Sequence, residues 1–205
     1  MGGDHLIKSA FQYIENHDKP RFINNFGEYR NPNYHLFPVG KRENWWMVQP
    51  YLIALLLAPG VPMLWQGQEL CENNSLPGNG EGRVGLLRPV HWEYFYDEPG
   101  SRLLSLVRKL LKIRSSCEEF RHGEYYFVNE ASLRDASLLV YRRTLGSEES
   151  VVAINFGATD RTVSVQLPHP GTYKELLYGH DTVVVEPNKP SQLTVPKNYG
   201  RIWHS

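Results

Sequence analysis

Residues 11–18 read Phe-Gln-Tyr-Ile-Glu-Asn-His-Asp, and residues 59–69 read Pro-Gly-Val-Pro-Met-Leu-Trp-Gln-Gly-Gln-Glu. In each stretch a short apolar run turns abruptly polar, which is typical of a buried strand where it leaves a sheet. We therefore predict strands over residues 10–14 and 61–65. Ligands of parallel α/β proteins bind at the carboxyl ends of the strands, so both polar clusters are placed where chemistry would occur.

Two helices are predicted, one before and one after the second strand. Residues 44–58 form a long apolar stretch that is kinked or restarted at Pro50 and ends before a Pro-Gly pair. In residues 101–115, leucine and valine recur at three- and four-residue steps, with arginine and lysine mostly on other faces. Strand, helix, strand, helix is the order of a right-handed parallel unit, so this part is predicted to be α/β.

Beyond residue 120 the pattern changes from helical spacing to alternation. Short alternating runs are punctuated by glycine, proline and asparagine, which is typical of an antiparallel β-sandwich. The predicted strands are residues 124–128, 137–142, 150–156, 161–166, 173–177, 182–185, 192–195 and 201–203. The sequence thus predicts an α/β part over residues 1–118 and an all-β domain over residues 119–205.

Composition limits the class of partner. Lysine and arginine together number 22, as do aspartate and glutamate, so the chain lacks the positive field by which proteins bind nucleic acid or anionic membranes. The most apolar run, residues 51–62, is too short to span a bilayer. Cys71 and Cys117 are far apart and lack metal-ligand spacing, which favours free thiols in a reducing compartment. We expect a cytoplasmic protein with no nucleic-acid or membrane partner and no metal or other cofactor.

Neither polar cluster is decisive when taken alone. His17 can be a structural histidine and Asp18 a turn or helix cap. In the second cluster, Gly67 allows close backbone approach and Glu69 is polar, but a simple strand-to-loop turn explains both equally well. The loop over residues 19–43 is rich in aromatic side chains, which either stack on sugar rings or pack within the loop.

In this order and at this separation, the two clusters resemble glycoside hydrolase family 13, the α-amylase family. The seventh barrel strand of that family ends in a motif similar to residues 11–18, and its eighth strand is similar to residues 60–69. Arg-Pro-Val-His-Trp at residues 88–92 and Phe-Arg-His-Gly at residues 120–123 fit as well. The resemblance covers essentially the whole chain. It implies a partial (β/α)8 barrel, namely its last two βα units, followed by an antiparallel β-sandwich.

The resemblance also implies roles for individual residues. Asp18 matches the family's third carboxylate, which stabilises the oxocarbenium-like transition state of an α-glucan or maltooligosaccharide substrate. His17 matches the adjacent histidine, which hydrogen-bonds a sugar hydroxyl. Asn16 belongs to the same motif and is a candidate substrate-binding residue. Arg21 lies just beyond it and is another candidate, although a surface or loop-pairing role explains it equally well.

The resemblance does not extend to a complete active site. In that family the nucleophile and the acid/base, the two carboxylates that a retaining glycosidase needs, come from earlier strands. No other carboxylate of this chain matches them, so we expect the isolated segment to be inactive and the activity to belong to a longer parent. The motifs do not fix hydrolysis, transfer, trehalose release or debranching.

Two alternatives to an enzyme segment stay open at this point. One is a non-catalytic β-sandwich module that binds carbohydrate or stabilises a barrel. The other is a pseudo-enzyme that uses Asp18 only for binding. Because two strands cannot close an eight-stranded barrel, we also expect the exposed barrel remnant to favour a homodimer.

Overall fold

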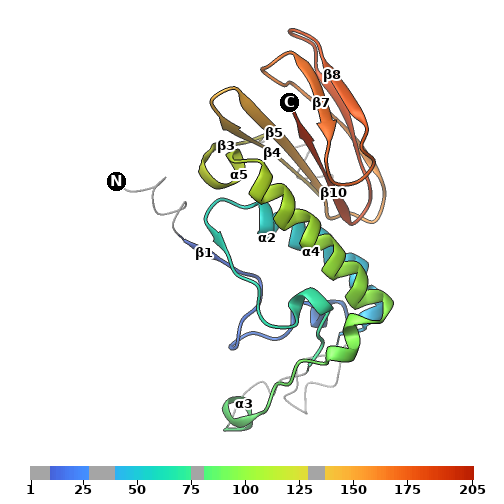
Figure 1. Ribbon diagram of the computed structural model, residues 1–205. Helices are drawn as coiled ribbons and strands as arrows, with labels where there is room; N and C mark the ends of the chain where they lie inside the picture. The colour runs from blue at the N-terminus through green and yellow to red at the C-terminus, as the bar shows by residue number, and fades with distance from the viewer. Residues whose placement is uncertain (1–9, 28–39, 75–80, 129–136) are drawn as a thin grey trace.

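The computed structural model describes residues 10–27, 40–74, 81–128 and 137–205 (Figure 1). Strand and helix alternate in the first part, and strands dominate the second. Between them runs the long helix α4 (Glu98–Ser116), which lies alongside α2 (Gln49–Leu57) and reaches the sheet (Figure 1). The shorter helices are η1 (Phe22–Phe26), η3 (Arg42–Met47), η4 (Gln68–Leu70), α3 (Glu81–Gly85), η5 (Trp92–Phe95) and α5 (Glu119–His122).

The two strands of the first part, β1 (Phe11–Gln12) and β2 (Val61–Pro62), run parallel. The N–H of Met63 donates to the carbonyl of Gln12 at 2.8 Å. The predicted parallel arrangement is therefore confirmed. Both strands are shorter than predicted, because among the described residues each strand has a partner on one side only.

The two main helices differ from their predicted limits at the N-terminal end. Residues 42–47 form the 3-10 helix η3, and α2 begins anew with Pro50 in its first turn, where the missing N–H of proline costs nothing. Helix α4 starts earlier than predicted because Asp97 caps it by accepting the N–H of Gly100 at 2.9 Å. Within the described residues, no helix has the length and apolar character needed to cross a bilayer.

The end of α2 is tied to α4 through one side chain. The guanidinium of Arg114, on α4, donates to the carbonyl oxygens of Leu56, Ala58 and Gly60 at 3.0, 2.9 and 2.6 Å. These carbonyls belong to the last turn of α2 and the turn into β2, where the helix has no N–H groups left to offer them. Arg114 therefore fixes where β2 begins.

The second part is an antiparallel sandwich, as predicted. Its six-stranded sheet has the order β3-β4-β5-β10-β7-β8, and β6 pairs with β9 in a second, two-stranded sheet. The order places the last strand of the chain between β5 and β7, in the interior of the larger sheet (Figure 1). The strands are β3 (Glu124–Phe127), β4 (Leu138–Leu145), β5 (Glu148–Asn155), β6 (Arg161–Val165), β7 (Gly171–Glu175), β8 (Thr182–Val185), β9 (Ser191–Val195) and β10 (Tyr199–His204).

Both faces of the six-stranded sheet are buried at its middle strand β5. Successive side chains of a strand point to opposite faces, and on β5 Val152 and Ile154 join the core around α2 and α4, whereas Val151 and Ala153 join the core under β6 and β9. The first core also includes Leu52 of α2, so it is continuous between the helical part and the sheet. The division into residues 1–118 and 119–205 stays a prediction about domains.

Candidate functional site

The parallel pairing of β1 and β2 brings the polar segments after the two strands to one edge. The imidazole of His17, from the first segment, lies with its ring centroid 5.9 Å from that of Trp65, from the second. These two residues line a hollow of about 420 Å³ together with Asp18, Gln66 and residues of the 84–88 segment. The first polar cluster therefore borders the same hollow as Trp65 and Gln66, which directly precede the second cluster.

His17 and Asp18 present their side chains to solvent at this edge. Their side chains are 66% and 71% exposed, and Nε2 of His17 lies 3.2 Å from Oδ2 of Asp18. The N–H of Asp18 donates to Oδ1 of Asn16 at 2.9 Å, which makes a local turn of the kind asparagine favours. Asn16 thus fixes the backbone at the point where His17 and Asp18 leave the strand.

Arg21 does not share this exposure. It is 3% exposed, and its Nη1 donates to Oε1 of Glu15 at 2.9 Å and to the carbonyl of Gln66 at 2.7 Å. The carboxylate of Glu15, which is also buried, accepts the N–H of Phe22 at 2.5 Å. Burial raises the pKa of Glu15, against the opposing effects of the Phe22 hydrogen bond and the Arg21 charge. Arg21 therefore joins the ends of both strands from beneath the exposed edge.

A second buried carboxylate, Glu72, organises the segment that follows β2. It accepts the N–H groups of Asn73, Asn74 and His91 at 3.0, 3.2 and 3.0 Å, and Nδ1 of His91 lies 3.0 Å from its Oε1. Gly67 packs against it in a left-handed conformation with φ of +82°, and a Cβ there would lie 3.1 Å from the Cβ of Glu72. The roles of Glu15 and Glu72 were not predicted from the sequence, because isolated glutamates carry no spacing signal.

Arg88 anchors the far wall of the hollow. Its Nη1 donates to the carbonyl of His17, and its own carbonyl accepts Nε2 of Gln66 at 3.4 Å. This places Leu86 and Leu87, both exposed, along one side of the hollow. Of the aromatic loop, residues 28–39 lie outside the described residues.

The edge offers groups suited to a hydroxylated ring. An aromatic face, an imidazole and a carboxylate border the hollow, and such groups stack on sugar rings and hydrogen-bond their hydroxyls. Among the described residues that line it, Asp18 is the one carboxylate. A retaining glycosidase needs two carboxyl groups about 5 Å apart, so the residues that line this hollow do not by themselves supply such a pair.

The amino-acid sequence of the sandwich is similar to a known domain family. Residues 130–205 match the family model described as the α-amylase C-terminal all-beta domain. The likeness to that domain covers the sandwich from β4 onward. Solved structures extend the likeness to the helical part, because they cover 95–96% of the chain. Together these findings support the assignment that the motifs predicted, to the C-terminal part of an α-amylase family protein.

Three of these structures illustrate the relationship. An α-amylase from Geobacillus thermoleovorans, complexed with acarbose, has a TM-score of 0.69 and 20% identity over 96% of this chain and 39% of its own. A debranching enzyme from Nostoc punctiforme, soaked with acarbose, has a TM-score of 0.62 and 24% identity, and the match covers 96% of this chain and 34% of the enzyme. AmyP in complex with maltose has a TM-score of 0.72 and 15% identity, and the match covers 95% of this chain and 40% of AmyP.

At these identities the likeness shows the fold alone. The chain spans between 34% and 40% of the length of these three structures. No curated protein matches it.

Proposed function

We propose that this chain forms the C-terminal part of a retaining α-glucan-acting glycoside hydrolase or transglycosylase. The observation that carries the proposal is the parallel pairing of β1 and β2, which sets Asp18 and His17 beside Trp65 at the carboxyl ends of two strands. Structures of the same fold are complexed with maltose or acarbose, which supports an α-glucan or maltooligosaccharide as substrate.

In this proposal Asp18 acts on the transition state. Positive charge develops on the sugar ring as the glycosidic bond breaks, and a carboxylate fixed beside the ring is attracted to it more strongly than to the neutral substrate. The neighbouring His17 donates to a ring hydroxyl from the same edge, and Asn16 holds the turn that presents both. The nucleophile and the acid/base come from the remainder of the parent.

Arg21 contributes as a positioning residue. Its guanidinium is buried against Glu15 and the carbonyl of Gln66, beneath the edge that faces substrate. Of the two roles that the sequence left open for Arg21, pairing within the loop region is the one we propose. Removing the arginine would release the strand ends from one another and leave the Glu15 carboxylate buried without its partner.

The test is the substitution Asp18→Asn in the full-length parent. We expect kcat on maltooligosaccharides to fall by roughly 10²-fold or more, the scale of losing one group that stabilises transition-state charge. The Tm should stay within a few degrees of the wild-type value, because the side chain is exposed. Glu93→Gln, which removes an exposed carboxylate outside the hollow, is the control and should leave kcat unchanged. A normal kcat for Asp18→Asn would refute the assignment.

A second role, stabilisation of a barrel by the sandwich, is favoured by one observation. The middle of the six-stranded sheet buries Val152 and Ile154 of β5 and Ile202 of β10 in one core with α2 and α4 instead of leaving them in solvent. We propose that this packing supports the barrel whether or not the parent is catalytic. We also propose a reducing, cytoplasmic location, because Cys71 and Cys117 are buried free thiols.

A further inference from the structure

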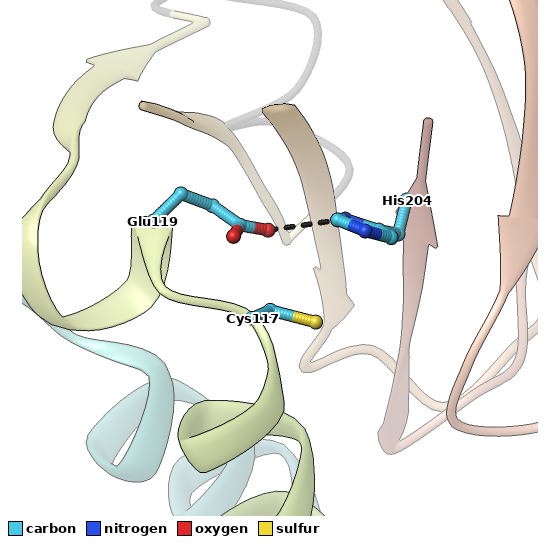
Figure 2. Close-up of side chains that lie close together, drawn as sticks. All are labelled: Cys117, Glu119 and His204. Carbon is cyan, nitrogen blue, oxygen red and sulfur yellow. Dashed lines mark hydrogen bonds and ion pairs between the residues drawn. The ribbon is translucent and has the colours of Figure 1, made fainter. Parts of the chain in front are cut away.

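A second cluster of reactive side chains lies away from the ends of β1 and β2, where the helical part meets the six-stranded sheet. Cys117 follows the last turn of α4, Glu119 begins α5, and His204 is the final residue of β10. Figure 2 shows the three side chains pointing toward one another. One ligand atom from each, a sulfur, an oxygen and a nitrogen, lies within 4.8 Å of the other two.

The contacts within this cluster are short. Oε1 of Glu119 lies 3.1 Å from Nδ1 of His204 and accepts the hydroxyl of Ser150 at 2.5 Å. That hydroxyl lies 3.1 Å from the same imidazole nitrogen. On its other side, Nε2 of His204 lies 3.4 Å from Oε2 of Glu148. Glu119 is 1% and Cys117 8% exposed, so the cluster is largely withdrawn from water.

Burial and neighbouring charged groups shift the pKa values of Cys117 and His204. Burial, with the charges of Glu119 and Glu148, raises the pKa of Cys117 to about 11. The hydrogen bond to Glu119 raises the pKa of His204 despite its burial. A divalent cation binds thiolate and neutral imidazole directly, so its binding releases any proton that these groups carry.

We propose that Cys117, Glu119 and His204 form a zinc site. Thiolate, imidazole and carboxylate are the three ligand types that Zn²⁺ takes together, as a borderline-soft cation without a geometric preference of its own. Tetrahedral bonds of roughly 2.0–2.3 Å place ligand atoms about 3.5 Å apart. The three ligand atoms already lie within 4.8 Å of one another, so binding the metal requires only a small inward movement of the side chains.

The fourth position of the metal has room. A hollow of about 490 Å³ opens beside the cluster and is bordered by Cys117 and His204 themselves. Lys109 and Lys112 also line it, and their positive charges favour an anion such as hydroxide as the fourth ligand. Ser150 already bonds Glu119, so it would hold the ligating carboxylate from the second side, as outer partners of metal ligands do.

The experiment uses the whole chain without a histidine tag, treated with a chelator and returned to chelator-free buffer. Zn²⁺ is titrated by calorimetry, and Co²⁺ is added separately as a spectroscopic probe, because a cobalt–thiolate bond absorbs in the near ultraviolet. We expect one Zn²⁺ per chain, a cobalt–thiolate band, and a Tm that rises with Zn²⁺.

Cys117→Ser should abolish the band and weaken Zn²⁺ binding by about 100-fold or more, beyond the loss expected for an outer partner. Cys71→Ser is the matched control, since it removes the other buried thiol, which lies outside the cluster. It should keep the band and the affinity. Ser150→Ala should keep the band and weaken binding by about 10- to 100-fold.

Three results would overturn the proposal: no cobalt–thiolate band in the wild type, an equal loss of binding in Cys71→Ser, or unchanged binding in Cys117→Ser. Circular dichroism checks that each variant is folded. Where Cys117→Ser is unfolded, His204→Asn provides the second variant, and it must weaken Zn²⁺ binding to a similar degree for the site to stand.

Discussion

The strand pair β1–β2 and the six-stranded sheet differ in how far their apolar side chains are buried. Phe11 is 70% and Val61 45% exposed, although both lie on paired strands. On β5, by contrast, the residues from Ser150 to Ile154 are all buried, because helices cover one face and β6 and β9 the other. The sheet finds its partners within this chain. The strand pair exposes the surface that, in a closed barrel, neighbouring strands would cover.

The largest expected effect concerns that exposed surface. We predict that the isolated chain self-associates at low micromolar concentration, because exposed apolar strands are templates for pairing. A micromolar dissociation constant corresponds to about 8 kcal/mol of binding free energy. Sedimentation velocity or light scattering measures the mass. The double variant Phe11→Ser, Val61→Thr should shift the chain toward monomer. Wild-type chain that stays monomeric across this range would contradict the prediction.

The next effect concerns the shared core. Ile202→Ala, on β10, removes a fully buried side chain from the core that also contains Leu52. We expect the free energy of unfolding to fall by about 2–5 kcal/mol. Val184→Ala, at a 68% exposed position on β8, is the control and should change it by less than about 0.5 kcal/mol.

Because the core is continuous, helical and sheet signals should be lost in one transition. Denaturant unfolding is monitored by far-ultraviolet circular dichroism, which reports mainly the helices, and by the fluorescence of Trp203 on β10 in a chain whose other four tryptophans are replaced. Two separate midpoints would show that the regions unfold independently and would weaken the comparison.

The smallest effect is a pH dependence of opposite sign in the two regions. Burial raises the pKa of Glu15, so the protonated form is favoured in the folded chain, and stability falls as pH rises above the ordinary glutamate value of about 4.3. Although burial alone would raise it, hydrogen bonds from His204 and Ser150 hold the pKa of Glu119 below its ordinary value. The stability from Glu119 is present above that ordinary value and is lost as pH falls through the lowered pKa.

The measurement is the free energy of unfolding of the wild type, Glu15→Gln and Glu119→Gln between pH 3 and 8. Glu15→Gln should remove the loss on the alkaline side, and Glu119→Gln the loss on the acid side. A tenfold change in the acid dissociation constant on folding corresponds to about 1.4 kcal/mol of stability. The same slope in both variants would contradict the opposed signs.

The sequence predicted the sandwich well, because alternation and turn residues are local signals. The strand predicted over residues 182–185 matches β8 (Thr182–Val185), and the predicted limits of β5 differ by one or two residues. The start of α2 was less predictable. Residues 44–47 were predicted to belong to the same helix, but they are part of the 3-10 helix η3, which ends before α2 begins at Gln49 with Pro50 in its first turn. Apolar spacing does not distinguish the two helix types.

In the candidate site, too, local sequence patterns predict some features and not others. Residues 16–18 were predicted as site residues because they follow a recognisable strand motif, and their role stays a prediction. The burial of Arg21 depends on the carbonyl of Gln66, 45 residues away, and only the folded chain brings the two together. The zinc cluster lies further still beyond sequence patterns, since Glu119 and His204 are 85 residues apart and on different elements. The spacing of the two cysteines gave no sign of it.

Arg114 has a consequence for how this chain can tolerate change. Its guanidinium binds three main-chain oxygens between residues 56 and 60 and no side chain there. Every amino acid supplies that oxygen, so this attachment does not depend on which side chains the segment carries. The arginine has no such freedom, because lysine lacks the planar fork that reaches several acceptors at once. The attachment therefore restricts the residue at position 114, whereas burial of Leu56 and Leu57 and the positive φ of Gly60 restrict the segment itself.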